Sequence, residues 1–208
     1  MQSLDRRSHW ENVYSSKAET EVSWFEESPA ISLELIADAG AGPDSAIIDV
    51  GGGASRLVAA LIDRGFRDVT VLDLAESALA KAKVRLGARA GAVQWIAADA
   101  TAWRPSRQFD VWHDRAVFHF LTEPADQAAY VHRLKEGLKP GGCAIIGTFA
   151  PDGPERCSGL PVARHDSASL ARVLGPSFEL IAAHRHEHHT PRGVIQNFQF
   201  STFRKSLS

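Results

Sequence analysis

Hydrophobic and polar positions follow two alternating periods along the chain. Short, mostly apolar runs such as AIIDV and VTVLDL are each followed by a segment with apolar residues at helical spacing, SRLVAALIDRG and ESALAKAKVRLG. The alternation continues through AVQWIAAD, FDVWHD, the helical stretch ADQAAYVHRLKEGLKPGG and CAIIGTF. Because its strands are apolar throughout and alternate with helices, this pattern predicts a parallel sheet covered on both faces.

The two ends of the pattern differ from its middle. Ser28 and Pro29 predict the start of a helix over ISLELIADAG, with serine at the N-cap and proline in the first helical position. Towards the other end, FELIAAHRHEHH and VIQNFQFSTF are separated only by TPRG, which is too short for a crossover and predicts an antiparallel hairpin. We therefore expect an α/β fold: a Rossmann-like, doubly wound, mostly parallel seven-stranded sheet with a C-terminal antiparallel hairpin.

Length and composition narrow the class of protein. A chain of 208 residues predicts one domain, residues 1–208. No apolar run approaches the roughly 20 residues of a membrane span, and the first residues lack a secretory signal, so we expect a soluble, cytoplasmic protein with no membrane partner. The net charge of −2 is spread along the chain without a basic stripe, so no nucleic-acid partner is expected. Two cysteines are too few for a disulfide framework, and nothing indicates the oligomeric state.

A glycine-rich loop, Gly51, Gly52 and Gly53, follows the first strand, which carries Asp49 two residues before the loop. In a doubly wound sheet the ligand lies beyond the carboxyl ends of the strands, and glycines let the backbone approach it. Such loops commonly hold a dinucleotide pyrophosphate or S-adenosylmethionine. Arg56 stands where the dinucleotide pattern requires its third glycine. An acid beside an ammonium and a sulfonium is electrostatically favourable, so the loop favours S-adenosylmethionine.

Acidic residues also close the next two strands. Asp73, 24 residues after Asp49 and followed by Leu74, is predicted to accept hydrogen bonds from two ribose hydroxyls. Asp99 is placed to accept from an adenine amino group, while the backbone N–H of Ala100 serves a ring nitrogen. Each acid alone is more often a helix cap than a ligand. Three acids that close three successive strands favour a cofactor site.

The motifs DVGGGAS, VLDL and AADAT, with the terminal hairpin, resemble class I S-adenosylmethionine-dependent methyltransferases over essentially the whole chain. The family's loop usually reads (D/E)xGxGxG, and Ser55 replaces its last glycine with a small residue that can cap the helix. The resemblance implies transfer of a methyl group by in-line displacement from S-adenosylmethionine to an unidentified nucleophile on a protein lysine or a small molecule.

Three longer stretches are similar to a narrower bacterial subgroup, which is akin to the lysine methyltransferases of citrate synthase and elongation factor 1A. They are HWENVYSSKAETEVSWFEESP, VWHDRAVFHFLT and TFAPDGPERCSGLPVARHD. The lysine enzymes typically have Asp-Lys-Gly-Thr after the fourth strand. This chain instead has Asp114-Arg115-Ala116-Val117.

Candidates for the chemical step lie at the end of the fourth strand. Methyl transfer needs mainly the alignment of donor and acceptor, and a nucleophile with a free lone pair. Asp114 is the favoured residue for alignment or base work, and His113 and His119 are candidates for taking a proton. A hydrogen-bonded structural role fits His113 equally well.

Aromatic residues gather in the N-terminal segment, residues 1–27. Trp10, Tyr14, Trp24 and Phe25 lie among polar residues outside the alternating pattern. We favour a lid whose rings cover the methionine part of the cofactor and exclude water. A helix packed on the sheet edge is the alternative.

A histidine cluster and Cys157 are two further candidate site features. Alternate histidines of His184–His189 share one face of a strand, and three imidazoles can bind zinc, but ligands spaced so regularly seldom converge, so no metal is expected. Cys157 lies near the expected acceptor pocket and is interpreted as a small buried side chain.

Two alternative functions fit the same predicted fold. One is a nicotinamide-dependent oxidoreductase, which Arg56 and the hairpin disfavour. The other is a catalytically silent cofactor-binding module.

Overall fold

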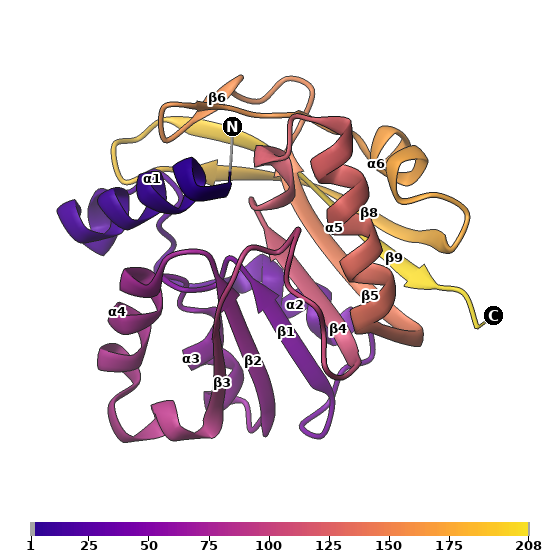
Figure 1. Cartoon of the computed structure of the whole chain (residues 1–208), viewed down its shortest axis with the longest axis horizontal. Helices are drawn as coiled ribbons and strands as arrows, with labels where there is room; N and C mark the ends of the chain where they lie inside the picture. The colour runs from indigo at the N-terminus through magenta and orange to yellow at the C-terminus, as the bar shows by residue number, and fades with distance from the viewer. Residues whose placement is uncertain (1–2, 208) are drawn as a thin grey trace.

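A seven-stranded sheet forms the centre of the computed structural model, which describes residues 3–207, with side chains from residue 6 onward (Figure 1). The strand order is β3-β2-β1-β4-β5-β9-β8. These strands are β1 Ala46–Val50, β2 Asp68–Asp73, β3 Val93–Ala97, β4 Phe109–Arg115, β5 Leu138–Phe149, β8 Phe178–His189 and β9 Ile195–Lys205. The strands β1 to β5 are parallel, and β9 pairs antiparallel with both β5 and β8. The predicted sheet and terminal hairpin are confirmed.

The connecting segments are mostly helical. They are α1 Ser3–Ser16, η1 Glu19–Glu21, α2 Ala30–Asp38, α3 Leu57–Asp63, α4 Glu76–Leu86, η2 Gly87–Ala92, η3 Phe118–Phe120, α5 Pro124–Gly137 and α6 Ser167–Leu174. A separate two-stranded ribbon joins β6 Arg156–Cys157 to β7 Leu160–Pro161. The sequence pattern missed α6 and this ribbon. It also placed the start of α2 one residue early, since Pro29 is the N-cap and no side chain caps the helix.

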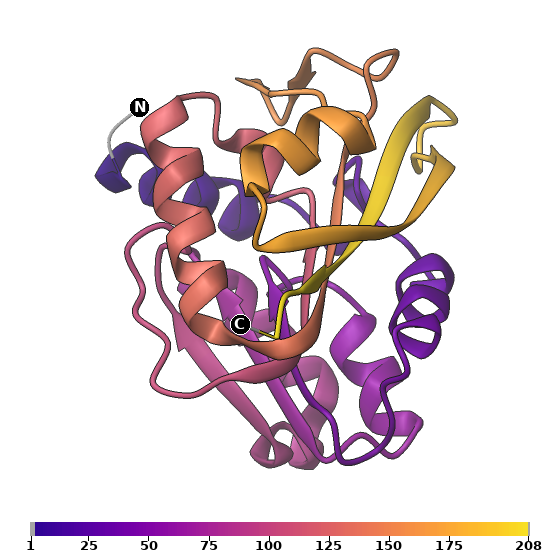
Figure 2. The same ribbon diagram turned by 90° about the vertical axis from the view of Figure 1, so that its right-hand side faces the viewer.

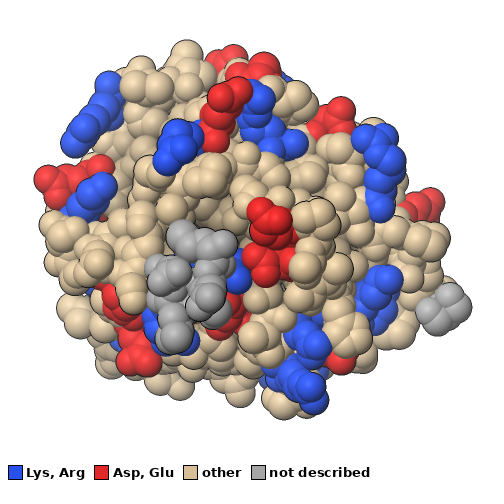
Figure 3. Space-filling view, turned by 45° about the horizontal axis from the view of Figure 1, so that its top comes forward, with Lys and Arg blue, Asp and Glu red and all other residues tan. Residues whose placement is uncertain are grey.

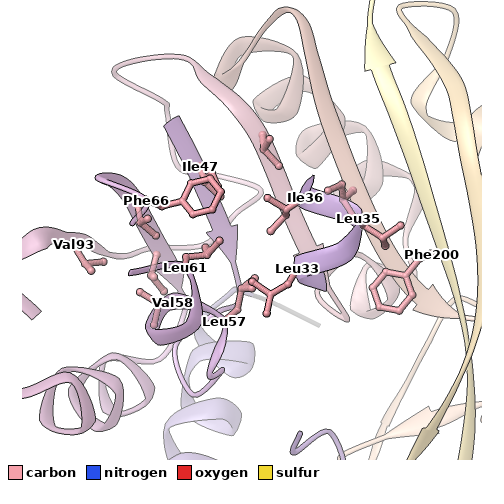
Figure 4. Packing of buried hydrophobic residues seen from close by; sticks show 14 of the residues in the cluster. Leu33, Leu35, Ile36, Ile47, Leu57, Val58, Leu61, Phe66, Val93 and Phe200 are labelled. Atoms are coloured by element: carbon pink, nitrogen blue, oxygen red, sulfur yellow. The ribbon is translucent and has the colours of Figure 1, made fainter. Parts of the chain in front are cut away.

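Two hydrophobic cores lie on opposite faces of the sheet because successive strand residues point in opposite directions. Ile47 packs in one core with Ile36 of α2 and Leu61 of α3, as Figure 4 shows. The next residue, Ile48, packs in the other core with Tyr130 of α5. Figure 2 shows α5 and α6 on one side of the sheet and α2 and α3 on the other. Both faces are therefore covered, as the apolar strands predicted.

Charged residues of both signs are interspersed on the face of the molecule seen in Figure 3. That face shows no broad area of one charge. Separately, none of the helices in residues 3–207 combines the length and the apolar character needed to cross a bilayer.

Candidate cofactor and acceptor site

A pocket enclosing about 910 Å³, open solvent included, lies at the carboxyl ends of the parallel strands. The strand order reverses between β1 and β4, which is where doubly wound sheets bind their ligands. We call this the central pocket. Most of the predicted cofactor residues line it: Trp10, Tyr14, Trp24, Gly51, Asp73, Leu74, Asp99 and Ala100. The structure thus brings together residues that are far apart in the sequence.

A second pocket of about 700 Å³ adjoins the first, and Gly51 and Trp24 line both. The predicted residues Asp49, Gly52 and His113 line only this second pocket. Three other predicted residues line neither pocket: Gly53, Asp114 and His119.

The glycine loop packs directly on the acids of the strand ends. A Cβ atom on Gly52 would lie 2.1 Å from Oδ2 of Asp49, and one on Gly53 would lie 2.8 Å from Oδ2 of Asp73. Gly51 has a φ of +74°, which favours glycine. Contacts within the protein therefore require glycine here, in addition to the approach of a ligand that the sequence suggested.

Asp73 and Asp99 present carboxylates to the central pocket. Asp73 is 5% exposed and accepts from the backbone N–H of Gly53 at 3.0 Å and of Ala75 at 2.8 Å. Burial raises the pKa of Asp73 to about 6. Oδ1 of Asp99 accepts from the backbone and hydroxyl of Thr101, and its Oδ2 lies 3.6 Å from the guanidinium of Arg6.

Asp49 belongs to a buried hydrogen-bond chain. Its Oδ1 lies 2.7 Å from Nδ1 of His113, and Nε2 of that histidine lies 2.9 Å from Oγ of Ser32 in α2. All three residues are buried. Both ring nitrogens of His113 are therefore engaged within the protein. Sequence reasoning missed Ser32, because no local pattern links position 32 to position 113.

Asp114 points away from both pockets. Alternation along β4 directs its side chain to the α5 face, where it accepts from Oη of Tyr130 at 2.5 Å and from the backbone N–H of Val117 at 2.8 Å. Burial raises its pKa to about 6 against the effect of these hydrogen bonds. His119 is also fully buried, and burial lowers its pKa to about 3. The structure does not bring these two predicted catalytic residues to the pocket wall.

Asp114→Asn is expected to affect stability more than turnover. The folded-state pKa of about 6 lies above the ordinary 3.8, so the proton on Asp114 stabilises the fold at low pH, and this contribution is lost as the pH rises towards 6. Asparagine cannot titrate, and it has one amide oxygen in place of two carboxylate oxygens. Either the Tyr130 hydroxyl or the backbone N–H of Val117 therefore loses its acceptor, at a cost of about 1–3 kcal/mol. The melting temperature of the wild type should exceed that of the variant most near pH 4, and by less near pH 7. A large loss of turnover with an unchanged melting curve would instead assign Asp114 to the chemistry.

Arg115 points to the pocket side of β4 and joins three segments. Its guanidinium donates to the carbonyl oxygen of Trp24 at 3.0 Å and to Oε1 of Glu26 at 2.7 Å. On the hairpin, Nε2 of His188 donates to the carbonyl oxygen of Ser23 at 2.7 Å, and its Nδ1 lies 3.5 Å from Glu26. These contacts fix the N-terminal segment over the carboxyl ends of the strands. No local pattern indicates these contacts, because the paired residues are about 90 to 165 positions apart.

The following residue, Ala116, has a φ of +71°. This left-handed conformation favours glycine, which stands here in the Asp-Lys-Gly-Thr segment of the lysine enzymes. The backbone turn after β4 therefore exists in this chain without the residue that forms it most easily.

Aromatic rings of the N-terminal segment form a roof over the central pocket. The ring of Trp10 lies 5.7 Å from that of Trp24 and 5.0 Å from that of Phe120, while Tyr14 lies 6.0 Å from Trp24. The segment is also helical, and Glu11 of α1 accepts hydrogen bonds from the first backbone N–H groups of α4. One helix thus packs on α4 and lines the pocket.

Two histidines of β8 approach one carboxylate. Nδ1 of His188 lies 3.5 Å and Nε2 of His186 lies 4.0 Å from Oε1 of Glu26, whereas His184 pairs across the strands with Phe200. Within residues 3–207 no cluster of three or more side chains is arranged to hold a metal ion. Cys157 is a buried free thiol that lines the central pocket.

Comparison with known proteins adds a family match. Residues 47–142 match the model of a family described as a methyltransferase domain. That segment contains the glycine loop, Asp73 and Asp99. None of the curated proteins compared with this chain matches its sequence significantly.

Solved structures share the fold across nearly the whole chain. One, described under the conversion of a disulfide bond into a thioacetal group during echinomycin biosynthesis, is 20% identical, with a TM-score of 0.76 and coverage of 97% of this chain and 94% of its own. The 1,6-didemethyltoxoflavin-N1-methyltransferase of Burkholderia thailandensis, with bound 1,6-didemethyltoxoflavin and S-adenosylhomocysteine, is 23% identical, with a TM-score of 0.69 and coverage of 98% and 85%. The N-methyltransferase NodS of Bradyrhizobium japonicum WM9, in complex with S-adenosylhomocysteine, is 16% identical, with a TM-score of 0.71 and coverage of 94% and 97%.

At these identities the likeness establishes the Rossmann-like methyltransferase fold. Residues 47–142, which match the methyltransferase-domain family, form part of that fold. S-adenosylmethionine-dependent methyl transfer is the activity, and S-adenosylmethionine the cofactor, that the family match and the fold support. The nicotinamide-dependent alternative has no comparable support.

Proposed function

We propose that the protein transfers a methyl group from S-adenosylmethionine to a small molecule bound in the central pocket. One observation carries this proposal: the carboxyl ends of β1, β2 and β3 deliver Gly51, Asp73 and Asp99 to a single pocket under an aromatic roof. The pocket also extends past β4 to β5 and β9, so it offers room beside the cofactor residues.

The residues present fit the cofactor. Each oxygen of the Asp73 carboxylate accepts one backbone hydrogen bond and has a further lone pair for a ribose hydroxyl. Hydroxyl donors there would stabilise the ionised form, which burial disfavours. The rings of Trp10, Tyr14 and Trp24 suit a positively charged sulfonium, because aromatic faces attract cations. When bound, S-adenosylmethionine supplies a methyl carbon activated by its sulfonium.

The pocket residues act by alignment and by exclusion of water. No imidazole is among the residues of the described chain that line the central pocket. Both ring nitrogens of His113 are hydrogen-bonded to Asp49 and Ser32. Asp114 and His119 do not line the central pocket. The acceptor must therefore present its lone pair without a histidine base, and the aromatic roof holds it in line with the methyl donor.

A small-molecule acceptor is favoured over a protein lysine. The Burkholderia thailandensis enzyme of the same fold has a small molecule, 1,6-didemethyltoxoflavin, bound with S-adenosylhomocysteine. In this chain Arg115 lies in the pocket wall and is paired with Glu26, so the wall there offers no unpaired carboxylate to a lysine ammonium. Protein lysine remains the second candidate because of the resemblance to the lysine methyltransferases.

Labelled S-adenosylmethionine tests the proposal. The purified chain is incubated with a cell lysate, which is then separated into protein and small-molecule fractions. Label is expected in the small-molecule fraction. Label confined to protein would support the lysine alternative, and binding of S-adenosylmethionine without any transfer would support a catalytically silent module.

We further propose that residues 1–27 act as a lid on a single domain, residues 1–208. Trp10→Ala removes the ring that contacts both Trp24 and Phe120, so the KM for S-adenosylmethionine should rise by about two- to tenfold. The melting temperature serves as the control for folding. An unchanged KM in a folded variant would show that α1 is only a packing element.

A further inference from the structure

The central pocket has two ends of different chemistry. The end over β2 and β3 has the acids Asp73 and Asp99, which the proposed function assigns to the cofactor. The other end lies past β4, on the opposite side of β1 in the strand order. We call it the acceptor half and define it by Phe120, Phe149, Cys157, Gln196 and Phe198.

The walls of the acceptor half are aromatic. Phe149 and Phe198 meet edge to face with ring centroids 4.8 Å apart, and Phe120 contacts the roof through Trp10. Both rings are only 1% exposed, and edge-to-face packing of this kind would be extended by a planar aromatic ligand placed beside them. The thiol of Cys157 is neutral, because burial raises its pKa to about 11.

The acceptor half disfavours a charged ligand. Arg115 borders it, and its guanidinium lies 5.2 Å from the ring centroid of Phe198. The guanidinium is already paired with Glu26, so this wall offers a charged ligand no unpaired counterion: an anion would compete with Glu26, and a cation with Arg115.

Gln196 is the exception to the apolar wall. It is 8% exposed, and its Oε1 has no hydrogen-bond partner within the described chain. A buried amide oxygen without a donor is unfavourable, and a ligand that donates to it would remove this cost. Gln196 lies near the start of β9 and lines the pocket, and the fold assigns its amide oxygen no other role.

From these features we infer that the acceptor half binds an uncharged planar aromatic or heteroaromatic molecule, and that Gln196 selects one with an N–H or O–H donor. The inference rests on the proposed function, because it places the cofactor in the other half. Gln196 is then a specificity-determining residue, and the methylated molecule belongs to the class of neutral aromatic hydrogen-bond donors.

Two bicyclic probes test this inference on the full chain saturated with S-adenosylhomocysteine. Indole carries an N–H donor, whereas naphthalene is also planar but has no polar atom. Their dissociation constants are measured by ligand-observed NMR for the wild type, Gln196→Leu and Gln196→Met. The matched control is Gln108→Leu, since Gln108 is exposed and does not line the pocket.

Gln196→Leu and Gln196→Met should each weaken indole binding by about tenfold, as expected for one lost hydrogen bond, and leave naphthalene binding unchanged or tighter. Gln108→Leu should change neither. An equal effect on both probes, or no effect on indole, would overturn the role of Gln196. If neither probe binds while S-adenosylhomocysteine does, the aromatic acceptor class is wrong and the proposed function stands. If S-adenosylhomocysteine itself does not bind, the proposed function fails and the inference fails with it.

Discussion

Replacing Gly52 by alanine should lower the free energy of unfolding by about 2–4 kcal/mol and abolish measurable S-adenosylhomocysteine binding. The added Cβ would lie 2.1 Å from Oδ2 and 2.5 Å from Cγ of Asp49, and real Cβ contacts are not that short. Asp49 is held by His113, which is in turn held by Ser32, so the carboxylate cannot withdraw without breaking this buried hydrogen-bond chain. The loop must move instead, and it carries Gly51 of the pocket wall.

Gly42→Ala is the matched control for this prediction. No atom lies within 4 Å of a Cβ built on Gly42, which is in the turn before β1. Chemical denaturation and calorimetric titration on both variants separate a general glycine effect from a loop effect. Gly52→Ala with wild-type stability and affinity would show that the packing of Asp49 against the loop is not tight.

Asp73→Ala is expected to weaken S-adenosylhomocysteine binding by about 1.5–3 kcal/mol, the range for hydrogen bonds to a charged group. The carboxylate is the acceptor proposed for the ribose hydroxyls, and it also holds the backbone of Gly53 and Ala75. Some stability should therefore be lost as well, and affinity is measured well below the melting temperature. Asp38→Ala, at an exposed acid on α2, should leave affinity unchanged. Equal affinity of wild type and Asp73→Ala would remove Asp73 from the site.

The fold could be predicted because its information is local. Apolar runs of five or six residues with helical segments between them define parallel strands, and four residues between FELIAAHRHEHH and VIQNFQFSTF allow only a hairpin. The cofactor end of the site could be predicted for the same reason, since the ends of parallel strands meet at one edge. Asp73 and Asp99 could be placed in the site because each follows a predicted strand. The helix α6 also has a local signal, because Asp166 caps its first turn, but this signal lies outside the hydrophobic pattern.

The acceptor end could not be predicted because it depends on orientation and on distant contacts. Asp114 and Arg115 are neighbours in sequence, but alternation turns the first to α5 and the second to the pocket. Only the placement of β4 in the sheet shows which neighbour faces the ligand. The pairing of β9 with β5 places Gln196 in the pocket wall. No sequence pattern around position 196 indicates that pairing.

Calorimetric titration of the wild-type chain with S-adenosylhomocysteine and, separately, with NAD tests the central claim most directly. The carboxyl ends of β1, β2 and β3 form a site that suits adenosine and a sulfonium, while Arg56 stands in place of the third glycine of a pyrophosphate loop. We predict saturable one-site binding of S-adenosylhomocysteine and no heat of binding with NAD. Binding of NAD, or a folded chain that does not bind S-adenosylhomocysteine, would contradict the account.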